Sequence, residues 1–260
     1  MLVNQIMERK RIIKLYINLI SYEKALSNVI DLAKQRISSY ACFVNGHMSI
    51  EAYDRKEFAE YVNNATFVLA DGKPLAIALR LLYGVKQDRI AGMDFMPSVL
   101  TECAKNNLSV FLFGSTDFVL EELKKRIEQN HPDLRIAGSI SPSFSEFSEE
   151  ETANYIGRIK ESNANIVLVG MGCPKQETWM AKNLKYIDAP LLGVGGAFSV
   201  YAGLVKRSPF WMQKFSLEWL YRLIQEPRRM WKRYLITNTL FICLIIRDLI
   251  VKMFSRKNDF

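Results

Sequence analysis

Short apolar runs alternate with longer helical patterns through most of the chain. The runs that we expect to form strands are residues 12–17, 41–45, 66–70, 109–113, 134–140, 166–169 and 191–194. Helical patterns separate them, at residues 21–37, 50–54, 74–82, 95–105, 117–129, 149–161 and 175–184. Strands that are apolar throughout are typical of a sheet covered on both faces. The pattern therefore predicts an α/β, Rossmann-like fold with a mostly parallel sheet between helices.

The end of the chain has a different pattern. From Pro209 onward it is rich in aromatic and arginine residues, and Pro227 divides two expected helices, at 216–225 and 228–254. The longest stretch without charge in this tail, residues 234–246, has 13 residues. A spanning helix needs roughly 20 apolar residues. We therefore expect an amphipathic helix that lies in the plane of a membrane surface.

Charge divides the chain at the same place. Residues 1–205 hold 23 basic and 23 acidic side chains, whereas residues 206–260 hold 12 basic and 4 acidic ones, so the tail carries the net charge of +8. We expect a catalytic α/β body at 1–205 and a basic helical appendage at 206–260. An appendage of this kind favours an anionic partner, such as a membrane surface.

Composition excludes several classes of protein. Hydrophobic residues make up 49% of the chain, which is enough for a substantial core and argues against disorder. The four cysteines form no CxxC pair and only two histidines are present, so a zinc finger or zinc ribbon is excluded. Residues 1–14 contain five charged side chains and no signal-peptide pattern. We therefore expect the protein on the cytoplasmic side of a membrane.

Glycine clusters follow three of the predicted strands. They are FLFGS at residues 111–115, VGMGCPKQE at 169–177 and GVGGAF at 193–198. Loops of this kind, placed between a strand and a helix, can turn backbone N–H groups toward a phosphate. Each glycine could equally serve only to turn the chain. Three clusters on one sheet edge favour a nucleotide-type ligand.

Carboxylates near strand ends are candidates for acid–base chemistry. Asp71 ends an apolar strand before Gly72, where burial would raise the pKa of a carboxyl and suit it as a general base. It could instead cap a turn or helix, as could Asp94, and Glu177 could only complement a helix dipole. The chain has no Asp-x-Asp pair for a metal-bound diphosphate, so we expect backbone N–H groups or arginines to meet that charge.

Seven motifs occur in one order along the chain: FVNGHM, ADG, RIAGMD, FLFGS, GMGCPKQE, GVGGAF and RSPFW…SLEWLYRLIQEPRRMWKRY. Together they resemble the WecG/TagA/CpsF family of bacterial glycosyltransferases, glycosyltransferase family 26. The resemblance covers about residues 13–234, and its last motif is long and specific.

The resemblance implies an inverting glycosyltransferase that needs no cofactor and no metal. Its donor would be a UDP-sugar and its acceptor a sugar on a polyprenyl diphosphate, in the synthesis of teichoic acid, capsule or exopolysaccharide. The enzyme would lie peripherally on the cytoplasmic face of the bacterial plasma membrane, as a possible homo-oligomer.

The motifs also assign roles to residues of this chain. Asp71 would be the catalytic base, with Gln176 and Asn45 as further catalytic residues. The donor would meet Gly114, Ser115, Gly170, Gly172, Pro174, Glu177, Gly195, Gly196 and Phe198. The acceptor and its diphosphate would meet Arg89, Asp94, Arg207, Arg222, Arg228, Arg229 and Arg233. No metal ligand is expected.

Three departures from the family pattern bear on the donor sugar. Many members have threonine where this chain has Phe43, aspartate where it has Ser199, and Gly-Tyr where it has Gly138 and Ser139. N-acetylmannosamine is therefore not assumed as the donor sugar.

Two other functions fit part of the sequence. A nucleic-acid-binding α/β protein could use the basic, aromatic tail on phosphates, but such a tail has little reason to expose the apolar residues of 234–246. A catalytically silent scaffold could dock a polysaccharide assembly on the membrane. The presence of Asp71 and Gln176 argues against it.

Overall fold

The computed structural model describes residues 7–143, 145–209, 211–212, 217–225 and 227–257, with backbone only at 222, 229–230, 232–234 and 255–257. These residues form eight strands: β1 Arg9–Ile12, β2 Leu15–Asn18, β3 Ser39–Val44, β4 Phe67–Ala70, β5 Val110–Gly114, β6 Ile136–Ile140, β7 Ile166–Gly170 and β8 Pro190–Gly193. The body helices are α1 Tyr22–Gln35, α2 Gly46–Asp54, α3 Lys56–Asn63, α4 Lys73–Tyr83, α5 Gly92–Lys105, α6 Asp117–Asn130, α7 Glu149–Ser162, α8 Lys175–Asn183, the 3-10 helix Leu184–Tyr186 and α9 Ala197–Tyr201. The tail forms α11 Glu218–Gln225 and α12 Pro227–Lys257.

A six-stranded sheet in the order β4-β3-β8-β7-β5-β6 forms the centre of the body, and every neighbouring pair is parallel. The chain leaves β5 toward the edge strand β6, whereas it leaves β7 in the other direction, toward β8. Ligands of open parallel sheets bind beyond the carboxyl ends of the strands, where neighbouring connections diverge. The predicted α/β, mostly parallel fold is confirmed.

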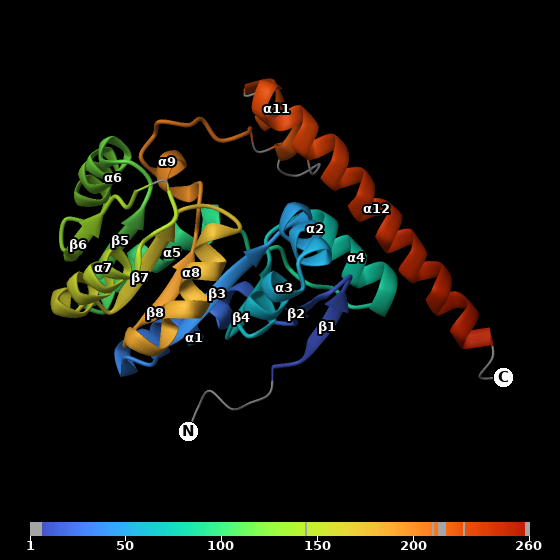
Figure 1. The fold of residues 1–260 in the computed structure, drawn as a ribbon, viewed down its shortest axis with the longest axis horizontal. Coiled ribbons are helices and arrows are strands. Elements are labelled where there is room, and N and C mark those ends of the chain that lie inside the picture. Colours follow the sequence, from blue (N-terminus) through green and yellow to red (C-terminus); the bar gives the residue numbers. More distant parts are fainter. Residues whose placement is uncertain (1–6, 144, 210, 213–216, 226, 258–260) are drawn as a thin grey trace.

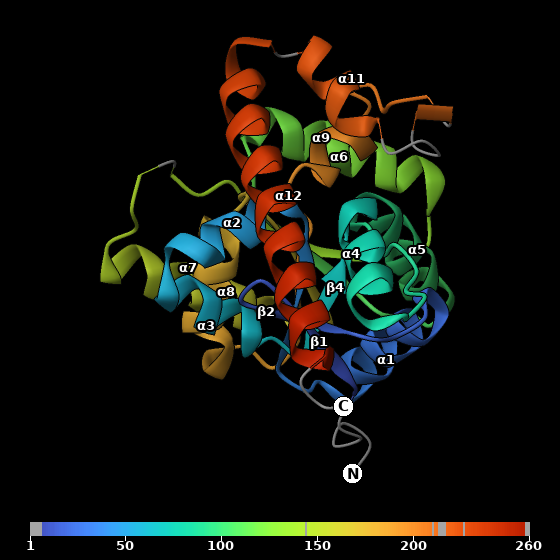
Figure 2. The same ribbon diagram turned by 90° about the vertical axis from the view of Figure 1, so that its right-hand side faces the viewer.

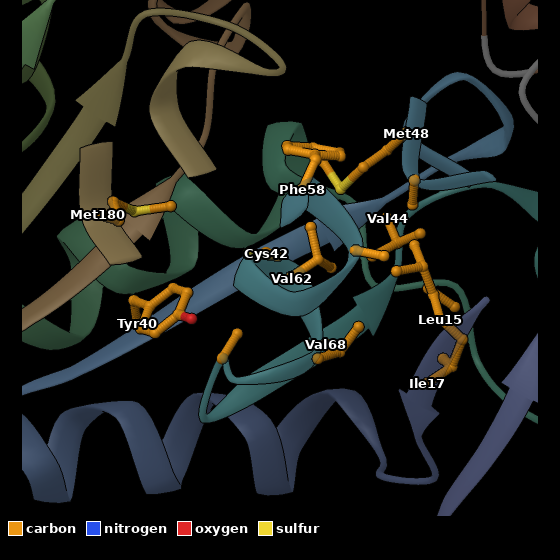
Figure 3. Packing of buried hydrophobic residues seen from close by; sticks show 14 of the residues in the cluster. Leu15, Ile17, Tyr40, Cys42, Val44, Met48, Phe58, Val62, Val68 and Met180 are labelled. Atoms are coloured by element: carbon orange, nitrogen blue, oxygen red, sulfur yellow. The ribbon is translucent and has the colours of Figure 1, made fainter. Parts of the chain in front are cut away.

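Helices cover both faces of this sheet (Figure 1). The helices α1, α5, α6 and α9 pack on one face, while α2, α3, α4, α7 and α8 pack on the other. Alternate residues of β3 serve the two layers: Tyr40, Cys42 and Val44 face the second set of helices, and Ala41 and Phe43 face the first. Figure 3 shows Phe58 and Val62 of α3 in the same buried cluster as Tyr40, Cys42 and Val44. Burial on both faces explains why the strand sequences are apolar throughout.

The prediction of a single N-terminal strand was wrong. Instead of one strand at 12–17, β1 and β2 make an antiparallel hairpin that turns at Ile13, whose φ is 59°. A left-handed β-branched residue is an unusual turn, and no glycine, proline or asparagine marks it in the sequence. The hairpin is fastened to the sheet by Asn18, whose Oδ1 accepts a hydrogen bond of 2.6 Å from the Val68 N–H.

Several helix starts follow their sequence signals. Ser21 caps α1 as expected, since its hydroxyl accepts from the Lys24 N–H. Ser148 and Glu151 form a reciprocal capping box at α7. The patterns did not predict α3 or α9, and α5 begins at Gly92 rather than at 95.

The long tail helix α12 lies along the body beside α2 and α4 (Figure 2). Phe241, Leu244 and Ile245 are buried on its inner side, at the spacing of one helix face. Near its end Lys252 lies over the ring of Tyr83, with Nζ 4.1 Å from the ring centre. Within the described residues, we find no helix with the length and apolar character that crossing a bilayer requires.

Candidate active site

Asn45 and Asp71 lie side by side at the carboxyl edge of the sheet, directly after β3 and β4. The Asp71 N–H donates to the Val44 carbonyl at 2.8 Å. A Cβ atom on Gly72 would lie 3.8 Å from Cβ of Asn45. Asn45 also caps α2, because its Oδ1 accepts from the Met48 N–H at 3.1 Å. The structure thus brings together two of the three predicted catalytic residues, both half-buried.

The N-terminus of α5 lies over the next strands along this edge. A Cβ on Gly92 would lie 3.5 Å from the Phe43 ring and 3.6 Å from Cα of Val194. One residue on, Met93 reaches to 4.0 Å from the corresponding position on Gly196. The helix therefore joins the Asn45 side of the edge to the glycine loop after β8.

Close packing explains two of the predicted donor glycines. Gly114 and Gly170 are register partners at the ends of β5 and β7. A Cβ on Gly114 would come within 2.5 Å of the Gly170 carbonyl carbon, and one on Gly170 within 2.5 Å of the Phe198 ring. Such distances exclude any side chain, so these glycines are required by the strand ends themselves.

Gly172 has the opposite surroundings. Its φ is +82°, and within the described part of the chain no atom beyond its two sequence neighbours lies within 4 Å of the position that a Cβ would take. The loop therefore presents bare backbone to open space, where a ligand can approach closely.

Two backbone donors expected to face phosphate are used within the protein. The Gly172 N–H donates to Oε1 of Gln176 at 3.1 Å, and the Gly195 N–H donates to the Val169 carbonyl at 3.1 Å. The expectation that these loops offer such N–H groups to phosphate needs correction here. At these two positions the loops shape a surface and do not supply free donors.

Gln176 lies behind the loops, with 4% of its surface exposed. Its Nε2 donates at 2.8 Å to the Gly193 carbonyl and at 2.8 Å to Oε1 of Glu177. An amide group has two N–H donors, so both donors are occupied in addition to its oxygen. The predicted catalytic residue Gln176 therefore contacts loop backbone and a neighbouring carboxyl group.

Glu177 and Phe198 are also set behind the loops, although donor contacts were expected for both. Glu177 is 0% exposed, and Phe198 is 1% exposed. Burial raises the pKa of Glu177 to about 7, while hydrogen bonds from Gln176 and from Cys173 act in the opposite direction. Neither side chain presents a surface to a ligand, so both support the strand ends from within.

Other predicted donor residues lie on the rim. Ser115 follows β5 in a left-handed conformation with φ 65°, and its carbonyl accepts from the Ser141 hydroxyl at 3.0 Å. Pro174 is half-buried at the start of α8, and Gly196 is exposed at the start of α9. These residues and Gly172 outline the accessible part of the edge.

Four charged groups connect the tail to the body next to Asp71. The Asp94 carboxylate forms ion pairs with Arg89 (Nη2 to Oδ2, 2.6 Å) and with Arg207 (Nη2 to Oδ1, 2.5 Å). Arg89 also pairs with Glu218, with 2.8 Å between Nη1 and Oε2. Ile90, which follows Arg89, donates its N–H to the Ala70 carbonyl at 2.8 Å. The predicted acceptor residues Arg89, Asp94 and Arg207 thus form one cluster, in which both arginines already face carboxylates.

The predicted tail arginines belong to α11 and α12. Arg228 is exposed in the first turn of α12. The side chains of Arg222, Arg229 and Arg233 lie outside the described residues. Their proposed contact with the acceptor diphosphate stays a prediction.

The tail borders the Asn45–Asp71 edge from two directions. Glu218 approaches it through Arg89, and Phe241 lies 3.8 Å from the position of a Cβ on Gly46, the residue after Asn45. Sequence reasoning missed Glu218 and Phe241 as contacts of the site. Both stand within the tail that it did assign to the site, but only the folded chain shows which tail side chains turn inward.

His47, the lone histidine at this edge, has Nε2 4.0 Å from Oε1 of Glu51. Across the described ranges no three His, Cys, Asp or Glu side chains are grouped so that they could share a metal ion. The independence from metal stays a prediction.

Comparison with known proteins identifies the family. Residues 10–255 match the model of the glycosyl transferase WecG/TagA/CpsF family. The chain is 32% identical over 203 residues to an N-acetylglucosaminyldiphosphoundecaprenol N-acetyl-beta-D-mannosaminyltransferase of Bacillus subtilis (strain 168), with 77% of each chain covered. It is 30% identical to the protein of the same name from Bacillus spizizenii (strain ATCC 23059 / NRRL B-14472 / W23), over 77% of this chain and 76% of the relative. The chain therefore belongs to the WecG/TagA/CpsF family of glycosyltransferases.

Proposed function

We propose that this protein transfers a sugar from a UDP-sugar to a sugar carried on a polyprenyl diphosphate, with inversion at the anomeric carbon. The observation that carries the proposal is the pair Asn45 and Asp71 at adjacent strand ends, bordered by the tail. Membership of the family supports the reaction class, and the names of the two relatives support the class of acceptor.

Asp71 is the proposed general base. The acceptor hydroxyl oxygen attacks the anomeric carbon of the donor while the bond from that carbon to the UDP oxygen breaks. The hydroxyl proton passes to the Asp71 carboxylate, and the bonding electrons leave with UDP. A base positioned in this way contributes about 10²- to 10⁴-fold to the rate.

Charge on the leaving diphosphate is the second requirement of the reaction. Arginine meets diphosphate through two parallel N–H donors. We assign this role, in addition to the predicted contact with the acceptor diphosphate, to the tail arginines Arg222, Arg228, Arg229 and Arg233, without a metal ion. The cluster of Arg89 and Arg207 with Asp94 supports the assignment, because it joins the tail to the body beside the proposed base.

The donor sugar is left open between hexoses and N-acetylhexosamines. Both relatives are named as N-acetylmannosaminyl transferases. In this chain Phe43 is 4% exposed, and its ring centre lies 5.4 Å from that of Phe95. An apolar pair fills this position beneath α5, so we do not carry the relatives' donor over to this protein.

The outer side of α12 is the proposed membrane contact. Leu235, Ile242, Ile246, Ile250 and Met253 are all exposed, and their spacing places them along one side of the helix. Side chains of this kind enter the headgroup boundary, while the basic residues of the tail attract anionic lipid. We propose peripheral attachment at the cytoplasmic face of the plasma membrane.

A donor screen tests the proposed function. Purified protein is incubated with a lipid-diphosphate-linked N-acetylglucosamine acceptor and a panel of UDP-hexoses and UDP-N-acetylhexosamines. The mass of the lipid product is then measured by mass spectrometry. One donor should add the mass of a single sugar residue. Titration calorimetry with UDP and with a short RNA accompanies the screen. Binding of RNA without UDP binding, and no product from any donor, would instead favour a nucleic-acid-binding protein.

A further inference from the structure

Gln176 makes an unusual set of contacts for a residue expected to act in catalysis. It is the second residue of α8, yet its side chain reaches the loop after β7, the end of β8 and the carboxyl group of the next residue. Its oxygen holds the Gly172 N–H of the loop after β7, and its nitrogen holds the Gly193 carbonyl at the end of β8 and the Glu177 carboxyl. One buried amide group therefore joins two glycine loops.

The glycines beside Gln176 allow close packing around its amide group. A Cβ on Gly193 would lie 3.0 Å from Nε2 of Gln176 and 2.7 Å from Cε of Met180. A Cβ on Gly195, where φ is +52°, would lie 3.4 Å from Oε1 of Gln176 and 3.8 Å from Cα of Gly172. The glycines at 193 and 195 thus make space for the amide, and they set the two loops against each other.

The amide cannot serve as an acid or base, and a ligand that accepts hydrogen bonds could bind its nitrogen only by displacing the Gly193 carbonyl or the Glu177 carboxyl. A buried polar group that loses its partner costs about 1–3 kcal/mol. The hydrogen bonds of the Gln176 amide to the loops are therefore more stable than an arrangement in which a ligand replaces one of them. The open backbone at Gly172 and the exposed Gly196 lie on the two loops that Gln176 connects.

We propose that Gln176 is a positioning residue, which holds the loops at 171–174 and 194–196 together so that Gly172 and Gly196 form one surface for the donor nucleotide. Glu177 takes part as a hydrogen-bond acceptor, for which its charge is not required. The inference rests on the proposed function for the identity of the ligand. The connection between the loops is independent of it.

The test compares Gln176→Met with Asn165→Ala. Methionine keeps the length and volume of the side chain but removes the three hydrogen bonds. Asn165 is the matched control, because its side chain also joins separate segments, accepting from the Ser109 N–H at 3.0 Å and donating to the Ala33 carbonyl at 3.4 Å. It lies at the start of β7, on the opposite edge of the sheet. Glu177→Gln is the conservative variant, since an amide oxygen still accepts from Gln176.

Calorimetry measures the Kd for UDP, and initial rates give kcat and the KM for the donor. Gln176→Met should raise both Kd and KM about tenfold, which corresponds to loss of about one hydrogen bond, and kcat should stay within about threefold. Asn165→Ala and Glu177→Gln should leave the Kd for UDP unchanged. A large fall in kcat with normal UDP binding would instead make Gln176 a catalytic residue. An equal loss of UDP affinity in Asn165→Ala would show that general destabilisation causes the loss, and would contradict a specific role of Gln176.

Hydrogen exchange keeps the two proposals separate. If wild-type protein binds no UDP, the proposed function fails. Amide hydrogen exchange then tests by itself whether Gln176 connects the two loops. Gln176→Met should speed amide exchange at 171–174 and 193–196, whereas Asn165→Ala should not. Unchanged exchange in both loops of Gln176→Met would overturn the positioning role.

Discussion

Arg89 of the body and Glu218 of the tail form an ion pair, with 2.8 Å between Nη1 and Oε2. Arg89 is the more buried partner, with 17% of its side chain exposed against 33% for Glu218. The same guanidinium group also holds Asp94. Because Ile90 is hydrogen-bonded to the residue before Asp71, this pair fixes α11 to the strand end that carries the proposed base.

Replacement of Glu218 by glutamine should loosen α11 without unfolding the body. Arg89 keeps Asp94 as a partner, so only the contact with the tail is lost. A partly exposed ion pair contributes roughly 0.2–1 kcal/mol, which predicts a few-fold faster amide exchange in α11 and an unchanged Tm. Glu122→Gln, which removes the pair with Lys125 on α6, is the control. Unaltered exchange in α11 would show that the pair does not hold the tail.

Glu177 should make stability depend on pH. Its pKa is raised to about 7 in the folded protein, above its ordinary value of 4.5. The folded state therefore binds the proton of Glu177 more tightly than the unfolded state does. The contribution of this group to the free energy of unfolding is complete below pH 4.5 and is lost as the pH rises through 7. The loss amounts to roughly 3 kcal/mol.

Glu177→Gln should abolish most of this dependence, because the amide stays neutral. Chemical denaturation at pH 5 and pH 8 measures it. The variant should be more stable than wild type at pH 8 and similar at pH 5. A wild-type free energy of unfolding that does not fall between these pH values would contradict the raised pKa.

The exposed row on α12 should bind lipid through its apolar side chains. The double variant Ile242→Ser, Ile246→Ser should reduce flotation with vesicles of anionic lipid at least tenfold, even in high salt, since each buried isoleucine contributes roughly 1.5–3 kcal/mol. Phe118→Ser is the control, because Phe118 is even more exposed than the two isoleucines but lies on α6. Equal flotation of the double variant and the control would argue against this side of α12 as the membrane contact.

Activity should survive an excess of EDTA. The proposed reaction meets the charge of the diphosphate with arginine, so chelation removes nothing that it requires. Initial rates with and without EDTA, on protein purified in its presence, measure this. Loss of activity that manganese or magnesium restores would overturn metal independence.

The sequence predicted the sheet well, because strands buried on both faces are apolar throughout. The sequence also placed Asn45 and Asp71 at one edge of the sheet, because neighbouring parallel strands end at the same edge. It misread the hairpin at Ile13, where a tertiary contact through Asn18 holds a turn that local residues do not mark.

Side-chain direction was the main limit for the site. Glycine motifs indicated loops, but not that Gly114 and Gly170 touch each other or that Gln176 and Glu177 turn inward. The same limit hid the pairing of Arg89 with Glu218, whose positions are 129 residues apart in the chain. Such contacts depend on how the connections cross the sheet, which no local pattern records.

The role of Asp71 is tested most directly by the turnover of Asp71→Asn with the donor found by the screen, measured beside its Kd for UDP. Asp88→Asn, an exposed aspartate in the loop before α5, is the control. If Asp71 is the general base, Asp71→Asn should lose about 10²- to 10⁴-fold in kcat while UDP binds as in wild type, and Asp88→Asn should lose neither. Turnover of Asp71→Asn near the wild-type rate would contradict the proposed chemistry at this edge of the sheet.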